Sequence, residues 1–331
     1  MQRTMLAALS LVALAACEDA ATSPRSIAPE LPSADVSPAA LSHHFAKVDL
    51  NGTLLRGNNV TAVNKLSTGI YEVTFNTSMA NCAYVATTEN IYSQAVQAYT
   101  ASGHLSASGV YVETKNQGGG LTDGTFNLVA TCGATGIRYA VIGYNDDLVR
   151  STPGTTLQPL GSGRYNLQFA APASDCAYLG TVADPGNGLV FSPSGVYTAS
   201  GPNANSVYIE TKNPGGGLQA GVPFHIALVC NTLGRTRYAV VRRTGVIARA
   251  SVGTTITKPG IGTFQVNTNR SLSTCATINT RGSVNQAVPF NPATMETTAG
   301  VGPNSVGIQV RELLFFGGNL TDQAFHTASV C

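Results

Sequence analysis

The sequence predicts an all-β protein in which three tandem small β-sandwich modules follow a disordered tether. Glycine, threonine, valine, serine and asparagine are plentiful, helix-favouring residues are sparse, and only 11% of the 331 residues are charged. Apolar residues alternate with polar ones, and one pattern recurs three times along the chain. The hydrophobic content of 43% excludes disorder of the whole chain, and the net charge of +2 argues against nucleic acid as the main partner.

The first 16 residues have the pattern of an export signal. Arg3 supplies a positive charge, and the apolar stretch 5–16 is too short to span a membrane. It ends in Leu14-Ala15-Ala16-Cys17, which resembles the lipobox of bacterial lipoproteins. The resemblance implies cleavage before Cys17, acylation of this residue, and attachment to a membrane through the lipid. We favour the outer membrane or cell surface, and the inner membrane is the alternative. Residues 17–43 are rich in proline, serine and alanine without periodicity, which is typical of a flexible linker.

Three segments of the remaining chain align with one another: 44–132 (module 1), 138–230 (module 2) and 237–331 (module 3). Each has a central aromatic residue, an arginine 15 positions before it and a cysteine 11 positions after it. The aromatic residues are Tyr71, Tyr165 and Phe264, the arginines are Arg56, Arg150 and Arg249, and the cysteines are Cys82, Cys176 and Cys275. Because the linkers between segments are short, we expect the modules to follow one another as beads in a row.

Within a module the apolar period of two predicts strands. Tyr71-Val73-Phe75 and Val110-Val112 each alternate with polar residues, and Asn51-Gly52 marks a hairpin turn. About seven short strands in roughly 90 residues favour a β-sandwich, Ig-like or jelly-roll-like. A small barrel remains an alternative, since the strand count alone does not separate the two folds.

Six cysteines besides Cys17 fall two per module. The connectivity that respects the repeat pairs them within modules: Cys82–Cys132, Cys176–Cys230 and Cys275–Cys331. Disulfides suit an exported protein, and the sequence contains no CxxC or HxxxH spacing for zinc.

The modules also share a sequence pattern with other proteins. Gly69-Ile70-Tyr71-Glu72-Val73-Thr74-Phe75, followed by Cys82-Ala83-Tyr84, resembles uncharacterised β modules of bacterial surface proteins, some of which follow fibre stalks. These modules have no known activity that the resemblance would transfer to this chain. Module 3 departs from the pattern at Thr268 and Thr277, so we expect its core to be looser.

We identify no catalytic residue, metal site or cofactor site from the sequence. His225 and His326 occupy equivalent positions beside an inward phenylalanine, and we expect them to face outward. The repeated arginines Arg56, Arg150 and Arg249 could bind a carboxylate or sulfate group. Because they recur in every module, a packing and capping role is favoured.

The clearest candidate for a binding surface is an apolar run that only module 3 contains: Leu313, Leu314, Phe315 and Phe316. The run could contact a partner or fill its own core. The sequence thus predicts a non-enzymatic cell-envelope lipoprotein whose modules serve adhesion, binding of a protein or glycan, or structural spacing. The alternative is an exported hydrolase with an active site in one diverged module.

Overall fold

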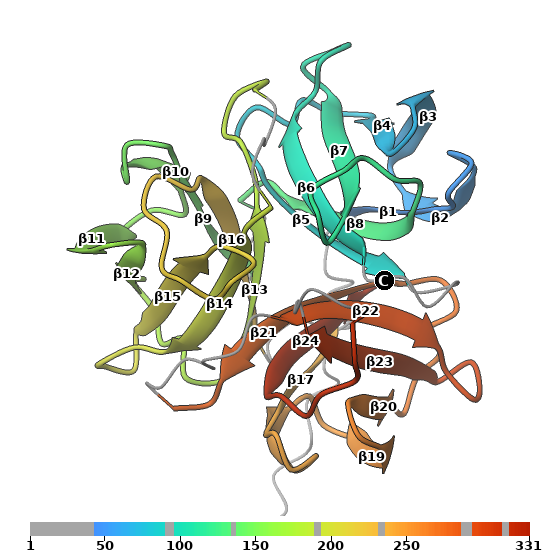
Figure 1. Ribbon diagram of the computed structural model, residues 1–331, viewed down its shortest axis with the longest axis vertical. Coiled ribbons are helices and arrows are strands. Elements are labelled where there is room, and N and C mark those ends of the chain that lie inside the picture. The colour runs from blue at the N-terminus through green and yellow to red at the C-terminus, as the bar shows by residue number, and fades with distance from the viewer. Residues whose placement is uncertain are drawn as a thin grey trace, which may run out of the picture. The chain divides into compact units, whose positions relative to one another are not determined.

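The computed structural model describes residues 43–89, 96–133, 137–188, 193–230, 236–285, 293–312 and 318–331. Every regular element in these ranges is a β-strand, so the all-β prediction is confirmed (Figure 1). No helix in the described ranges is long and apolar enough for a membrane crossing. The predicted signal peptide with Cys17, and the predicted linker up to residue 42, lie outside the described residues.

Eight strands recur in each of the three modules. Module 1 contains β1 (His44–Val48), β2 (Leu54–Asn58), β3 (Val60–Ser67), β4 (Ile70–Phe75), β5 (Ala83–Glu89), β6 (Val96–Ser102), β7 (Gly109–Asn116) and β8 (Thr125–Thr131). Module 2 contains β9 (Ile137–Ile142), β10 (Leu148–Ser151), β11 (Thr156–Gly161), β12 (Arg164–Gln168), β13 (Cys176–Val182), β14 (Gly195–Ser200), β15 (Ser206–Lys212) and β16 (Phe224–Cys230). Module 3 contains β17 (Arg237–Val241), β18 (Ile247–Ala250), β19 (Thr255–Gly260), β20 (Thr263–Asn267), β21 (Ala276–Ser283), β22 (Ala293–Ala299), β23 (Ser305–Glu312) and β24 (Phe325–Val330).

The strands of a module form two four-stranded sheets that face each other. In module 1 the strand orders are β2-β1-β8-β5 and β3-β4-β7-β6, and modules 2 and 3 repeat this arrangement. Tyr71 of one sheet packs against Phe126 of the other, with ring centroids 5.2 Å apart. Tyr165 with Phe224, and Phe264 with Phe325, fill the other two cores in the same way. Each module is therefore a β-sandwich, as the number of strands favoured, and not the alternative small barrel.

The structure has eight strands per module where the sequence predicted about seven. The single residue Asn59 separates β2 from β3. Asn59 adopts a positive φ of 64° at this point, which sends β3 into the other sheet. In module 2 the corresponding break contains Gly154, whose φ is 75°.

The three predicted disulfides are confirmed. Cys82–Cys132, Cys176–Cys230 and Cys275–Cys331 each join residues 50 to 56 positions apart. Each bridge joins the start of β5, β13 or β21 to the end of its neighbour β8, β16 or β24, so it fastens two paired strands of one sandwich.

The prediction of beads in a row is wrong, because the range Leu41–Cys331 forms one compact unit. Strand β14 pairs in parallel with β21, and β22 with β5, so two sheets continue from one module into another. A parallel bridge between Thr100 and Ala183 joins modules 1 and 2. The three modules thus contact one another in a cycle, and β5, β13 and β21 meet where they converge (Figure 1).

A shared core explains this association. It is formed by buried side chains from all three modules, such as Val85, Leu179 and Ile278. These residues lie on β5, β13 and β21, on the face opposite to the sandwich core. Because the outer face of each strand is also apolar, packing three modules together removes more apolar surface from water than a row would.

Candidate functional site: the cleft between modules 1 and 3

The three module interfaces are built from equivalent residues. Five positions after its first cysteine, each module has a threonine: Thr87, Thr181 and Thr280. The Thr181 hydroxyl accepts a hydrogen bond from the Ala86 amide at 2.8 Å and donates one to the Ala86 carbonyl at 3.1 Å. Thr280 binds the backbone of Gly180, and Thr87 that of Asn279, in the same way. These threonines therefore link module 2 to 1, module 3 to 2 and module 1 to 3.

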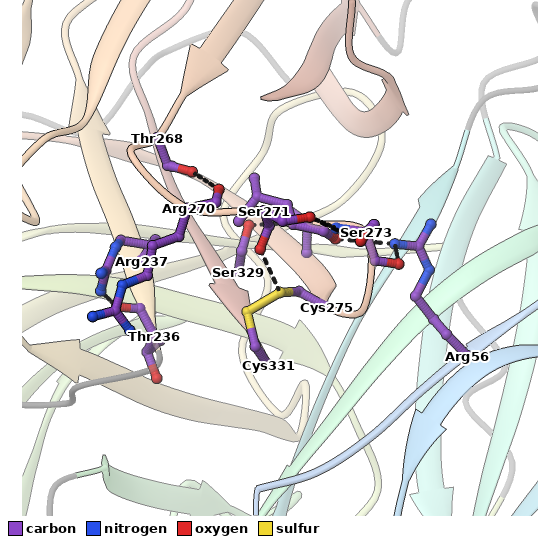
Figure 2. Close-up of a disulfide and its surroundings, with 12 residues drawn as sticks. Arg56, Thr236, Arg237, Thr268, Arg270, Ser271, Ser273, Cys275, Ser329 and Cys331 are labelled. Atoms are coloured by element: carbon purple, nitrogen blue, oxygen red, sulfur yellow. Dashed lines mark hydrogen bonds between the residues drawn. A yellow bond between two sulfur atoms is a disulfide. The ribbon is translucent and has the colours of Figure 1, made fainter. Parts of the chain in front are cut away.

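The repeated arginines also cross to the neighbouring module. Arg150 Nε donates to the Cys82 carbonyl at 2.9 Å, and Arg249 Nε donates to the Cys176 carbonyl at 2.8 Å. Arg249 also lies 4.8 Å above the ring of Tyr178. Arg56 Nη1 donates to the carbonyls of Leu272 and Ser273, just before Cys275 (Figure 2). These contacts support the packing and capping role.

His225 and His326 face outward from their own sandwich cores, as expected, but both are fully buried. The outer face of their strands is covered by the neighbouring module, which the repeat alone did not reveal. His225 Nδ1 accepts a hydrogen bond from the Tyr84 amide at 2.9 Å, and His326 Nδ1 accepts one from the Tyr178 amide at 2.8 Å. Burial is the main cause that holds the pKa of both imidazoles well below its ordinary value, which favours the neutral form that this acceptor role requires.

The interface between modules 3 and 1 departs from this scheme. Asn127 takes the place of the histidine, and Thr277 takes the place of the tyrosine. The Thr277 amide donates to Asn127 Oδ1 at 3.4 Å, which is longer than the equivalent bonds. Two small side chains therefore occupy positions that hold an imidazole and a phenol ring elsewhere.

A cleft of about 200 Å³ lies at this interface. Module 1 contributes Lys47, Arg56, Glu89 and Asn127 to its wall, and module 3 contributes mostly small residues, among them Thr277 and Thr297. Lys47 Nζ lies 2.5 Å from Glu89 Oε2. Lys47 and Asn127 are paired across β1 and β8, and Glu89 ends the next strand, so these polar side chains share one sheet face.

The cleft suits hydrogen bonding to a polar molecule. Asn127 Nδ2 donates to Thr297 Oγ1 at 3.2 Å, which fixes the amide, while Lys47 and Glu89 offer a donor and an acceptor side by side. Cys275 lines the cleft but is held in its disulfide, so it offers no thiol (Figure 2). Neither here nor in the rest of the described ranges do three or more metal-ligating side chains gather.

Of the residues predicted from the sequence, Arg56 lies in the cleft, whereas Arg150 and Arg249 lie at the other two interfaces. The run Leu313, Leu314, Phe315 and Phe316 lies outside the described residues. Lys47 and Glu89 were missed because they do not repeat. Their equivalents are Val141 and Val240 for Lys47, and Ala183 and Gly282 for Glu89. Both residues could have been found as charged positions of module 1 whose equivalents in modules 2 and 3 are uncharged.

Comparisons of this chain with protein-family models, with curated proteins and with solved structures found no match.

Proposed function

We propose that this protein is an exported, lipid-anchored binding protein without catalytic activity, and that the cleft between modules 1 and 3 binds a sugar residue of a surface glycan. The Leu-Ala-Ala-Cys sequence ending at Cys17 supports the lipid anchor. Three disulfides support an oxidising compartment outside the cytoplasm.

The observation that carries the proposal is the break in the repeat at one interface. Asn127 and Thr277 replace a larger pair, and Lys47 and Glu89 place charges where the other modules have uncharged residues. Changes on both sides of the same interface open one polar cleft. Residues needed for folding alone have to recur in each copy, whereas residues of a binding site do not.

The size and charge of the cleft favour a single polar group. Its volume of about 200 Å³ is below that of sites for drug-sized ligands, which begin at roughly 300 Å³. Lys47 and Glu89 neutralise each other, and the Arg56 guanidinium is engaged by the carbonyls of Leu272 and Ser273. Neutral hydroxyl groups, which both donate and accept hydrogen bonds, match such a wall.

Binding is favoured over glycoside hydrolysis by the acidic residues of the cleft. Hydrolysis of a glycosidic bond ordinarily requires two carboxyl groups flanking the bond. Among the described residues, Glu89 alone supplies a carboxylate to the cleft wall, and Lys47 neutralises it.

The test restores the repeat residues at the diverged interface. The full-length chain with Cys17→Ser, which needs no detergent, is compared with the same chain carrying Asn127→His and Thr277→Tyr. We expect the restored pair to fill the cleft and to reduce binding to immobilised neutral oligosaccharides at least tenfold, with the melting temperature kept or raised. The control carries Tyr178→Thr and His326→Asn, which loosen the interface between modules 2 and 3. It should be less stable but bind normally.

Retained binding by a folded Asn127→His/Thr277→Tyr chain would show that the ligand does not occupy the cleft. Absence of binding by the Cys17→Ser parent to every oligosaccharide in the panel would reject the glycan as ligand.

The lipid anchor has its own test. In a detergent phase separation of the full-length chain expressed in a bacterium, we expect the native protein in the detergent phase and Cys17→Ser in the aqueous phase. Both proteins in the aqueous phase would contradict acylation.

A further inference from the structure

A second, smaller pocket lies where the three modules meet. Its volume is about 90 Å³, and it is lined by residues of β5, β6, β13, β14, β21 and β22. It does not share a residue with the cleft between modules 1 and 3. Each module contributes the residue six positions after its first cysteine: Thr88, Val182 and Arg281. Module 3 has therefore placed a cation where the other modules have uncharged side chains.

Arg281 is a buried charge that forms no ion pair with the described residues. Its side chain is only 2% exposed, and its guanidinium lies 4.9 Å above the ring of Tyr197. By hydrogen-bond geometry Nε, Nη1 and Nη2 have no partner among the described residues, although the Tyr197 hydroxyl lies close to the guanidinium. Burial lowers the pKa of Arg281, and the proximity of Tyr197 and Glu312 only partly opposes this effect.

Further unpartnered donors surround the same pocket. Among the described residues, the donors Asn279 Nδ2, the Thr294 hydroxyl and the Tyr197 hydroxyl are buried without hydrogen-bond partners, and so is the acceptor Asn279 Oδ1. Folded proteins pair the great majority of buried polar atoms, because an unpaired one costs about 1–3 kcal/mol. A buried guanidinium without a counter-charge costs still more. Four such residues on one small pocket indicate a ligand that accepts hydrogen bonds and carries negative charge.

We propose that this central pocket binds a small oxyanion, namely a carboxylate, sulfate or phosphate group. Arg281 supplies the positive charge and a planar fork of donors, which matches two oxygens of such a group. Asn279 Nδ2, the Thr294 hydroxyl and the Tyr197 hydroxyl donate to the remaining lone pairs. Water molecules could satisfy these donors but would leave the guanidinium charge without compensation in a medium of low dielectric constant.

The ring of threonines makes this site depend on the assembly of the modules. Thr280 joins β21, which carries Arg281, to Gly180 of module 2, and Thr87 joins Asn279 to module 1. Tyr197 belongs to module 2, whereas Arg281, Asn279 and Thr294 belong to module 3. An oxyanion bound here would therefore stabilise the contact between modules 2 and 3.

The experiment measures the melting temperature of the full-length Cys17→Ser chain at constant ionic strength in chloride, acetate, sulfate or phosphate. We expect at least one oxyanion to raise the melting temperature by roughly 2–4 °C over chloride. In Arg281→Val, which has the residue of module 2, this rise should vanish. The melting temperature of the variant in chloride should equal or exceed that of the parent, because the unpaired charge is gone. The exposed Arg164→Gln chain should respond as the parent does.

The anions distinguish the source of the group. A response to acetate alone identifies the carboxylate of an organic acid, and a response to sulfate or phosphate identifies an inorganic ion. Calorimetric titration with the responding anion should show about tenfold weaker binding to Thr294→Val, which loses one hydroxyl and serves as readout if Arg281→Val does not fold.

The same oxyanion response in Arg281→Val as in the parent would overturn the proposal. So would a parent whose melting temperature is equal in all four salts, together with a variant that melts several degrees lower. In that case the guanidinium would act only by packing on Tyr197.

Discussion

The interface between modules 3 and 1 differs from the other two in side chains but not in architecture. All three interfaces keep the threonine that binds the neighbouring backbone and the arginine that binds neighbouring carbonyls. Only the interfaces 1–2 and 2–3 combine a buried histidine with a tyrosine ring. The hydrogen bonds from the threonines and arginines to the neighbouring backbone therefore suffice to join the three modules in a cycle. The histidine and tyrosine positions are free to change.

The location of the change is informative. Short linkers hold modules 1 and 2, and modules 2 and 3, next to each other in the chain, whereas modules 3 and 1 meet only through folding. No linker holds modules 3 and 1 together, so the chain compensates least for a loss of packing at their interface. The cleft nevertheless lies at this interface. The weaker interface is thus the one whose residues we assign to binding.

The largest expected difference between the interfaces concerns the arginines. Arg249→Ala removes a charged hydrogen bond and the contact with the Tyr178 ring, so we expect a loss of about 2–4 kcal/mol in the free energy of unfolding. Arg56→Ala removes bonds that are largely exposed and no ring contact, so we expect about 1 kcal/mol. Urea unfolding of both variants measures the two losses. Equal losses would mean that the ring contact contributes nothing.

The second difference is the response to acid. The pKa of His225 and His326 is depressed in the folded protein, so below the ordinary value of about 6.5 the unfolded chain binds protons that the folded one does not. Stability is therefore complete above that pH and falls below it, by about 1.4 kcal/mol per pH unit for each histidine. Asn127 does not titrate, so acid should weaken the interfaces 1–2 and 2–3 and spare 3–1.

Melting temperatures of the parent and of a histidine variant, measured between pH 7.5 and 5, test this expectation. Burial also lowers the pKa of His43 and His44, so the parent is compared with His326→Asn, which copies Asn127. The variant should lose stability less steeply on acidification than the parent. Parallel curves would show that His326 does not carry the acid sensitivity.

The sequence predicted what lies inside a module better than what lies between modules. Tyr71, Val73 and Phe75 could be placed in a core because period two has a direct structural meaning, and the cysteines could be paired because the repeat leaves one consistent choice. The shared core could not be predicted in the same way. Ala83-Tyr84-Val85 is apolar on both faces, but so short a run does not show what covers the second face.

The two pockets were missed for a related reason. Arg56 was found because it recurs, whereas Lys47, Glu89 and Arg281 stand out only when a copy is compared with its two neighbours position by position. A charge on a strand face reads as solvent-exposed until the neighbouring module is placed against it. In a chain of repeats, the positions that recur report on folding, and the positions that diverge are the better guide to binding.

The smallest expected effect concerns one hydroxyl. The hydroxyls of Tyr139 and Tyr238 donate to the carbonyls of Asn81 and Asp175, each just before the first cysteine of the neighbouring module, at 2.7 and 2.6 Å. Phe45 is the equivalent residue of module 1 and has no hydroxyl to offer. Tyr238→Phe should lower the free energy of unfolding by about 1 kcal/mol.

The converse substitution, Phe45→Tyr, asks whether the interface between modules 3 and 1 differs in geometry or only in residues. If the backbone before Cys275 lies as it does in the other modules, the new hydroxyl reaches the carbonyl of Thr274, and stability rises by up to about 1 kcal/mol. Urea unfolding beside Tyr238→Phe measures both changes on one scale. A loss on Phe45→Tyr would mean that the hydroxyl is buried without an acceptor, because module 3 sits differently against module 1. The cleft would then be a product of the altered docking, and Asn127→His with Thr277→Tyr would fill it only in part.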